Sequence, residues 1–166
     1  MIHTFIIAAQ TVDGFIAKDP SEISTAWTSG ADKKFFVERT KKAGVVVMGS
    51  KTFETIGKPL KDRLTIVYSR RGKAYEDVET TAKHPKDILG ELEQRGFREA
   101  AICGGASIYS LFLEAGVVDT LYITIEPKIF GSGVKLFDKK LHIDLELVST
   151  TQLSENVLLL EYKIIR

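Results

Sequence analysis

Short, nearly continuous apolar runs recur along the first three quarters of the chain, and each is about as long as a β-strand. Runs of this kind are typical of strands that are buried on both faces, as in a parallel sheet. They predict strands at residues 2–10, 45–48, 64–68, 100–103 and 120–126. Residues 145–153 and 157–165 instead alternate apolar and polar side chains around a polar turn, which predicts an antiparallel hairpin at the end of the chain.

Between these strands lie segments with helical spacing, which end at residues that stop helices. Helices are predicted at residues 30–43, 51–56 and 85–95, and a fourth follows the Gly104-Gly105 turn and continues to about Gly116. Residues 18–25 are polar and predict a surface loop. Strands and helices alternate to about residue 126, and strands dominate afterwards. This order predicts one domain, residues 1–166, with a three-layer α/β fold whose mainly parallel central β-sheet ends in an antiparallel C-terminal hairpin.

The composition is typical of a soluble globular protein, because 44% of the 166 residues are hydrophobic and 27% are charged. Since 23 basic residues balance 22 acidic ones, the net charge of +1 argues against a general binder of nucleic acid or membrane surfaces. Cys103 is the single cysteine and has no partner for an internal disulfide, which favours a reducing, cytoplasmic compartment. No apolar run approaches the roughly 20 residues of a membrane span. The three histidines lack metal-ligand spacing, so no metal site is expected.

The carboxyl ends of the predicted parallel strands carry the candidate chemistry. Ligands in open α/β sheets bind beyond these ends, and the segments that follow them begin at Asp13, Gly49, Ser69 and Gly104. We therefore expect these segments to meet at one edge of the sheet. The double glycine at Gly104-Gly105 allows a sharp bend, and the helix that follows offers free N–H groups to a phosphate. Taken alone, the same turn also fits a junction that is merely well packed.

Asp32 is the candidate acid. Phe35 and Phe36 share its face of the predicted helix, so burial beside them would raise its pKa and suit proton transfer near neutral pH. The alternative is structural, because Ser29 and Asp32 have the spacing of a capping box at a helix start. Trp27, the single tryptophan, fits either a core anchor or a shield for the acid.

Arg63 is the candidate anion clamp. It directly precedes a predicted buried strand, where an arginine can hold a carboxylate through two parallel hydrogen bonds. The alternative is a solvated charge beside the strand. In the same way, Lys51, Arg70 and Arg71 either grip a terminal phosphate or are ordinary solvated cations.

Four separated blocks of the chain together resemble the dihydrofolate reductase family. The most specific is VVVMGSKTFETIGKPLKDR at residues 45–63, and the others are Trp27 with Asp32 and Phe36, ICGGASIY at residues 102–109, and LYIT at residues 121–124. The resemblance covers most of the chain and implies a dihydrofolate reductase-like fold with NADPH as the cofactor. The implied reaction is the reduction of a small molecule, 7,8-dihydrofolate, to tetrahydrofolate by hydride transfer. The implied protein is cytoplasmic and is a monomer or a homodimer.

The same resemblance implies a role for each matched residue. Asp32 would hold the pterin and support its protonation, with Thr124 backing up the carboxylate and Trp27 nearby. Arg63 would bind the glutamate α-carboxylate of the substrate. The residues implied to line the substrate pocket are Phe36, Ile56 and Leu60. The residues implied to contact NADPH are Ala9, Ala17, Gly49, Lys51, Thr52, Ser69, Arg70, Gly104, Gly105, Ala106, Ser107 and Ile108.

Two features depart from the family pattern. Ser50 stands where the family usually has arginine, which weakens a preference for NADPH over NADH unless Lys51, Arg70 and Arg71 compensate. The segments DGFIA at residues 13–17 and GSGVKLF at residues 131–137 look more like the reductase domain of riboflavin biosynthesis. That domain shares the fold and uses NADPH to reduce a ribosylamino-pyrimidine phosphate, which makes this reaction the alternative function. A nucleotide-binding module without catalysis is the third possibility.

Overall fold

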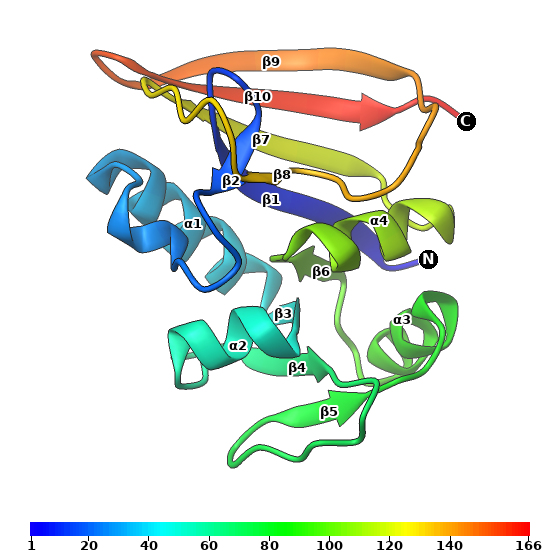
Figure 1. Ribbon diagram of the computed structural model, residues 1–166. Helices are drawn as coiled ribbons and strands as arrows, with labels where there is room; N and C mark the ends of the chain where they lie inside the picture. The colour runs from blue at the N-terminus through cyan, green and yellow to red at the C-terminus, as the bar shows by residue number, and fades with distance from the viewer.

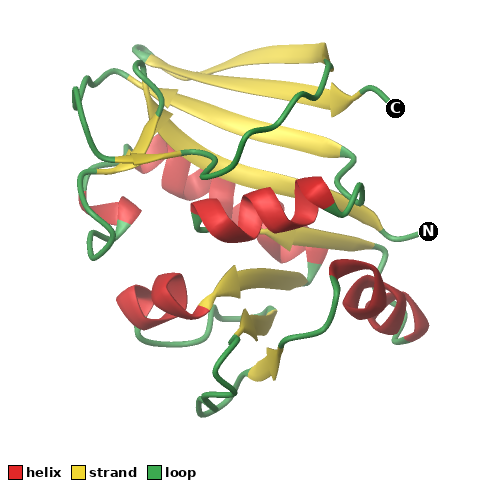
Figure 2. Cartoon of the chain, turned by 45° about the vertical axis from the view of Figure 1, so that its right-hand side comes forward, coloured by secondary structure: helices red, strands yellow, loops and turns green.

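The computed structural model describes residues 1–166 as a β-sheet with helices on both faces (Figures 1 and 2). The strands are β1 (His3–Thr11), β2 (Phe15–Ala17), β3 (Val45–Gly49), β4 (Leu64–Tyr68), β5 (Glu79–Thr81), β6 (Glu99–Ile102), β7 (Thr120–Glu126), β8 (Val134–Lys135), β9 (Leu145–Ser154) and β10 (Val157–Ile164). The helices are α1 (Gly30–Ala43), α2 (Ser50–Ile56), α3 (Pro85–Gln94) and α4 (Ala106–Glu114), with one turn of 3-10 helix, η1 (Ser24–Ala26). None of these helices has the length and apolar character needed to span a membrane.

The main sheet has eight strands in the order β5-β4-β3-β6-β1-β7-β10-β9. Every neighbouring pair from β5 to β7 is parallel. β10 runs antiparallel to both β7 and β9, and this edge lies at the top of Figure 1. The expected α/β class, the mainly parallel sheet and the antiparallel C-terminal hairpin are therefore confirmed.

Two apolar clusters lie on opposite faces of this sheet, and β3 contributes to both. Val45 and Val47 join the cluster that α3 and α4 cover, whereas Val46 and Met48 join the cluster against which α1 and α2 pack. Successive side chains of a strand point to opposite faces, so a strand covered on both sides is apolar at every position. This explains why the central strands were recognisable from unbroken apolar runs.

The structure adds strands that the sequence pattern does not predict. β5 is a three-residue edge strand beside β4, and β2 pairs with β8 in a separate two-stranded sheet. Strands of two or three residues are too short to carry a period-two pattern. The predicted loop at residues 18–25 also runs into the short η1 helix.

The turn after β1 is tied to the segment before β8. The carboxylate of Asp13 accepts hydrogen bonds from Thr11 Oγ1 at 2.6 Å, from the Gly131 N–H at 2.7 Å and from the Phe130 N–H at 3.2 Å. A Cβ atom on Gly133 would lie 2.3 Å from the carbonyl oxygen of Ala17, so the close approach of β8 to β2 requires glycine there. Segments about 117 residues apart thus form one unit beside the sheet.

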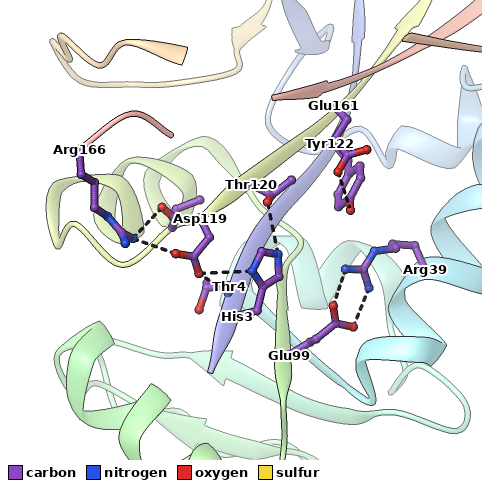
Figure 3. Close-up of polar contacts among 10 residues, drawn as sticks. His3, Thr4, Arg39, Glu99, Asp119, Thr120, Tyr122, Glu161 and Arg166 are labelled. Atoms are coloured by element: carbon purple, nitrogen blue, oxygen red, sulfur yellow. Dashed lines mark hydrogen bonds and ion pairs between the residues drawn. The ribbon is translucent and has the colours of Figure 1, made fainter. Parts of the chain in front are cut away.

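A partly buried ion pair joins α1 to the start of β6. Two parallel hydrogen bonds of 2.9 and 2.8 Å link the Arg39 guanidinium to the Glu99 carboxylate, as Figure 3 shows. The guanidinium also lies 3.9 Å from the centre of the Phe5 ring. The side chains are only 11% and 23% exposed, so water screens this pair weakly. The hydrogen bonds from Arg39 hold the pKa of Glu99 below its usual range.

Arg39→Ala is expected to lower the free energy of unfolding by about 2–3 kcal/mol, because it leaves the Glu99 carboxylate without its partner and uncovers Phe5. For a chain of this size, that is a fall in Tm of about 5–10 °C. The matched control is Arg95→Ala, which breaks a bidentate pair with Glu79 whose side chains are 42% and 47% exposed. It should cost less than about 1 kcal/mol. Equal losses in thermal unfolding would contradict this assignment.

The charge on Glu99 also predicts how the effect of Arg39→Ala varies with pH. Because the folded-state pKa of Glu99 is lowered, the pair contributes its stability above the unfolded-state pKa of the carboxyl group and loses it as the pH falls through the folded-state pKa. The difference in Tm between wild type and Arg39→Ala should therefore shrink in acid.

Candidate active site

The carboxyl ends of β1, β3, β4 and β6 border one large cavity of about 1090 Å³. The segments that follow Gly49, Ser69 and Gly104 all line it, so the structure brings them together at one edge of the sheet. A single small ligand typically occupies a pocket of about 300–1000 Å³. The cavity therefore lies at the upper end of this range.

Most of the residues singled out from the sequence line this cavity. On the substrate side these are Asp32, Phe36, Ile56, Leu60 and Arg63. On the cofactor side they are Ala9, Ala17, Gly49, Lys51, Thr52, Ser69, Arg70, Gly104, Gly105, Ala106, Ser107 and Ile108. Their roles stay predictions.

Trp27 and Thr124 are not among the lining residues. The Trp27 ring is 8% exposed and packs edge-on against Phe130, with 5.0 Å between ring centres. Its indole N–H is buried without an acceptor. Of its two sequence interpretations, the structure thus favours the core anchor. Thr124 lies on β7 outside the lining, near enough to the Asp32 carboxyl group for its hydroxyl to lower the pKa of that group.

Asp32 lies in the first turn of α1, which begins after the N-cap residue Ser29. The Ser29 Oγ atom accepts a hydrogen bond from the Asp32 N–H at 3.2 Å, so half of a capping box is present. The second bond of a capping box would join the Ser29 N–H to the Asp32 carboxylate, but this N–H donates to Glu126, and the Asp32 side chain lines the cavity. Burial raises the pKa of Asp32, the hydroxyl of Thr124 opposes that rise, and the charge of Glu126 adds to it. A carboxyl group of this kind stays protonated at a higher pH than a solvated aspartate and can support proton transfer.

Arg63, which also lines the cavity, is positioned by two hydrogen bonds. Its Nε atom donates to the Lys61 carbonyl oxygen at 2.9 Å, and one terminal nitrogen donates to Thr40 Oγ1 at 2.8 Å. The Thr40 hydroxyl in turn donates to the Phe36 carbonyl oxygen at 2.6 Å, which fixes this acceptor on α1. No carboxylate of the chain pairs with Arg63, and its second terminal nitrogen makes no hydrogen bond. The arrangement presents an oriented, uncompensated cation to a ligand carboxylate.

The glycines at the ends of β3 and β6 bring backbone against backbone. The Gly49 N–H donates to the Gly104 carbonyl oxygen at 2.8 Å, and the Gly104–Gly105 peptide bond is cis. A Cβ atom on Gly104 would lie 3.0 Å from the Tyr109 hydroxyl oxygen. Gly105 is the N-cap of α4, and no side chain caps this helix start. Its first N–H groups therefore face the cavity and favour an anionic group such as a phosphate.

A group of cations lines the end of the cavity near β4. Lys51, Arg70 and Arg71 form no ion pair, whereas Lys73 donates to Glu54 Oε1 at 2.8 Å. Cations without acidic partners beside a pocket favour a ligand that carries negative charge. The Ser69 hydroxyl oxygen accepts a hydrogen bond from the Lys73 N–H at 2.9 Å, so this side chain also shapes the basic turn.

Several contributors were not found from the sequence. Thr40 holds Arg63 from 23 positions away, Tyr75 donates to Glu54 at 2.7 Å, and Glu126 accepts from Ser29. Of these three residues, only Glu126 could have been recognised from the sequence pattern. In β7, Thr120, Tyr122, Thr124 and Glu126 alternate with apolar residues, and side chains two positions apart share one face.

The cavity contains no evident nucleophile or metal-binding group. Burial raises the pKa of the Cys103 thiol to about 12, so this side chain stays protonated and unreactive at neutral pH. No group of three or more histidine, cysteine, aspartate or glutamate residues in the chain could hold a metal ion. The chemistry available from the chain itself is proton transfer, charge recognition and the positioning of ligands.

Comparisons with known proteins identify the family of the chain. Residues 3–152 match the family described as dihydrofolate reductase. Dihydrofolate reductase of Haemophilus influenzae is 34% identical over 72% of this chain and 69% of its own. Dihydrofolate reductase from Enterococcus faecalis, complexed with NADP(H) and RAB-propyl, has a TM-score of 0.79 and 27% identity, and the match covers 98% of this chain and 96% of that one.

A reductase of riboflavin biosynthesis has the same fold. The diaminohydroxyphosphoribosylaminopyrimidine deaminase/5-amino-6-(5-phosphoribosylamino)uracil reductase from Thermotoga maritima has a TM-score of 0.79 at 18% identity, and the match covers 99% of this chain and 57% of that one. The chain thus has the fold that dihydrofolate reductases share with this enzyme. The chain belongs to the dihydrofolate reductase family.

Proposed function

We propose that this protein is a dihydrofolate reductase that transfers a hydride from NADPH to 7,8-dihydrofolate. The observation that carries the proposal is the pairing of a desolvated acid, Asp32, with an uncompensated cation, Arg63, in the lining of one cavity. The proposed substrate has the matching groups, an amino-pyrimidine edge to be held, an N5 atom to be protonated and a glutamate carboxylate. Phe36, Ile56 and Leu60 lie in the same lining and supply apolar contacts for its rings.

Each residue then has a defined task in the proposed reaction. The Asp32 carboxyl group holds the amino-pyrimidine edge and supports protonation of N5, and the nearby Thr124 hydroxyl favours its ionised form. Arg63 fixes the far end of the substrate through its carboxylate. NADPH supplies the hydride when bound. The sum of hydride and proton is the reduction of one C=N bond, so no further co-reactant is needed.

The residues present fit NADPH. The uncapped start of α4 and the Gly104-Gly105 backbone offer N–H groups and space to a pyrophosphate, and Arg70 and Arg71 offer positive charge to a 2′-phosphate. Ser50 leaves the position of the family's arginine without charge. We therefore assign recognition of the 2′-phosphate to the basic turn after β4.

The double variant Arg70→Ala/Arg71→Ala is expected to raise the Kd for NADPH by about 10-fold or more, because each charged hydrogen bond to a phosphate contributes roughly 1.5–3 kcal/mol. The Kd for NADH, which lacks the phosphate, should change little. Titration followed by cofactor fluorescence measures both. Lys73→Ala is the matched control, since that cation is already held by Glu54. Equal losses for the two cofactors would contradict the assignment.

The pyrimidine reductase of riboflavin biosynthesis is the second candidate. It is favoured by the segments that resemble that enzyme, which meet in this structure as the β2–β8 sheet beside the cavity. Its substrate carries a phosphate and no glutamate. A turnover assay that offers dihydrofolate and the ribosylamino-pyrimidine phosphate in parallel, each with NADPH and with NADH, tests the proposal. Turnover of the pyrimidine alone would replace dihydrofolate reduction with this second function.

A further inference from the structure

A buried glutamate on β7 has no part in the roles described above. Glu126 is 1% exposed, and none of the ion pairs of the chain includes it. A carboxylate without a cationic partner is costly to bury, and it needs hydrogen bonds from its surroundings. These come from one residue on another element. The Ser29 N–H and the Ser29 Oγ–H both donate to Glu126 Oε1, at 2.9 and 2.8 Å.

Ser29 is the N-cap of α1, and Asp32 occupies the third helical position after it. In a capping box, the acidic side chain at that third position accepts the N–H of the cap residue while the cap hydroxyl accepts the N–H of the acid. Here the second bond is present, from Asp32 N–H to Ser29 Oγ at 3.2 Å. The first bond is made by Glu126, which comes from a strand 97 positions away along the chain.

The replacement of Asp32 by Glu126 as the acceptor of the Ser29 N–H has a direct consequence for Asp32. An aspartate that closed its own capping box would turn its carboxylate back onto Ser29 and away from the cavity. Because Glu126 already occupies the Ser29 N–H, the Asp32 carboxyl group has no partner there and lines the cavity instead. Thr124, two residues before Glu126 on the same face of β7, lies near this carboxyl group and lowers its pKa.

We infer that Glu126 is a positioning residue for Asp32: it takes over the capping contact with Ser29 and thereby keeps the Asp32 carboxyl group free to face the substrate. The inference rests on the proposed role of Asp32 in reduction. It concerns the ligand-free protein as well, because every contact that supports it lies within the chain.

Charge adds to this geometric role. Burial is the largest cause of the raised pKa of Asp32, and the negative charge of Glu126 contributes further to it. Lys33, the next residue on α1, acts in the opposite direction, as does the hydroxyl of Thr124. From α4, the Tyr109 hydroxyl is near enough to respond to the charge of Asp32, but it donates to the Ile7 carbonyl oxygen and stays neutral.

Two substitutions separate the geometric role from the charge. In Glu126→Gln, the amide oxygen still accepts both bonds from Ser29, so Asp32 stays in place while one negative charge disappears. In Glu126→Ala, the acceptor disappears and the Ser29 N–H becomes available to Asp32. Titration of the aspartate side-chain carboxyl signals by carbon NMR, with Asp32→Asn identifying the signal, reports the pKa of Asp32 without any ligand.

We expect the pKa of Asp32 to fall modestly in Glu126→Gln and to fall below that of an ordinary aspartate in Glu126→Ala, where a backbone N–H would stabilise its ionised form. In parallel, kcat with dihydrofolate and NADPH at neutral pH should fall by about 100-fold in Glu126→Ala, as in Asp32→Asn, and by no more than a few-fold in Glu126→Gln. The high-pH limb of the profile should move to lower pH in Glu126→Gln.

Ser29→Ala is the matched control for fraying of the helix. It removes the cap hydroxyl and lowers Tm, yet it leaves the Ser29-position N–H bonded to Glu126, so the pKa of Asp32 should stay raised. An unchanged Asp32 titration in both Glu126 variants would overturn the inference, as would a Ser29→Ala variant that behaves like Glu126→Ala. If the NMR result is as expected but no variant turns over dihydrofolate, the proposed function fails while the positioning contact stands.

Discussion

Asp32→Asn is expected to lower kcat for dihydrofolate at neutral pH by about 100-fold or more, with the Kd for NADPH unchanged. Positioned general acids contribute about 10²–10⁴-fold to a rate, and the amide cannot supply a proton to the substrate. Asparagine has nearly the same shape as aspartate, so the fold around it is preserved. Steady-state turnover and cofactor titration measure the two quantities separately.

The pH dependence of the rate should differ between the wild type and Asp32→Asn in a defined direction. Because the folded-state pKa of Asp32 is raised, the wild-type enzyme keeps its acid form to a higher pH, and its rate should fall as the pH rises through that pKa. The asparagine variant should lack this step. Asp87→Asn is the matched control, since Asp87 also lies in the first turn of a helix but far from the lining residues. A normal rate in Asp32→Asn would remove Asp32 from the reaction.

The same variant should be at least as stable as the wild type at neutral pH. A carboxyl group whose pKa is raised by folding contributes stability below its unfolded-state pKa and loses that contribution as the pH rises through its folded-state pKa. The ionised, desolvated Asp32 therefore weakens the fold above that pKa, and asparagine removes the penalty. Thermal unfolding at several pH values measures this difference, and an Asp32→Asn variant that melts well below the wild type would contradict it.

Arg63→Ala is expected to raise KM for dihydrofolate by about 10–100-fold with a smaller effect on kcat. A charged hydrogen bond contributes about 1.5–3 kcal/mol, and the contact with the glutamate carboxylate is remote from the reacting atoms, so it is lost from ground state and transition state alike. Under the alternative function, the pyrimidine phosphate has no such carboxylate. The KM for the pyrimidine phosphate should therefore not depend on this carboxylate contact, so Arg63→Ala distinguishes between the two substrates.

Two controls define what Arg63 does. Lys61→Ala removes an exposed positive charge two positions away but keeps the carbonyl oxygen that orients Arg63, so it tests general attraction without the clamp. Thr40→Val keeps Arg63 and removes the hydroxyl that holds it, so it should raise KM by less than Arg63→Ala does. If Lys61→Ala raised KM as much as Arg63→Ala, general attraction rather than a clamp would explain the effect.

The fold was predictable to the extent that burial leaves a local pattern. β3 and β6 are covered on both faces, and their unbroken apolar runs identified them and the parallel sheet. The hairpin of β9 and β10 was visible from alternation: both strands begin where predicted, β9 ends one residue later, at Ser154, and β10 ends one residue earlier, at Ile164. β2 and β8 were missed because two or three residues carry no period, and their pairing depends on Asp13 and Gly133 contacting segments distant in the chain.

The Gly104-Gly105 turn illustrates the limit of a local motif. From its residues alone, the turn favoured a well-packed junction over a phosphate site. The structure joins its backbone to Gly49 across the ends of two parallel strands and leaves the start of α4 uncapped at the cavity. A motif whose function depends on what lies opposite it is therefore decided by strand order, which no short segment contains.

Asp32 shows most clearly what the sequence determines and what only the tertiary structure decides. Residue type and spacing determined on their own that Ser29 and Asp32 would start a helix and that Phe35 and Phe36 would follow Asp32 on one face, because helix caps and helical faces are set by neighbours a few positions apart. Whether Asp32 caps the helix or serves the cavity was left open. The tertiary structure decided it, because Glu126 and Thr124 reach Ser29 and Asp32 only when β7 crosses behind α1. Long-range packing thus decides whether the acid caps its own helix or lines the cavity, and with it the chemistry available to the site.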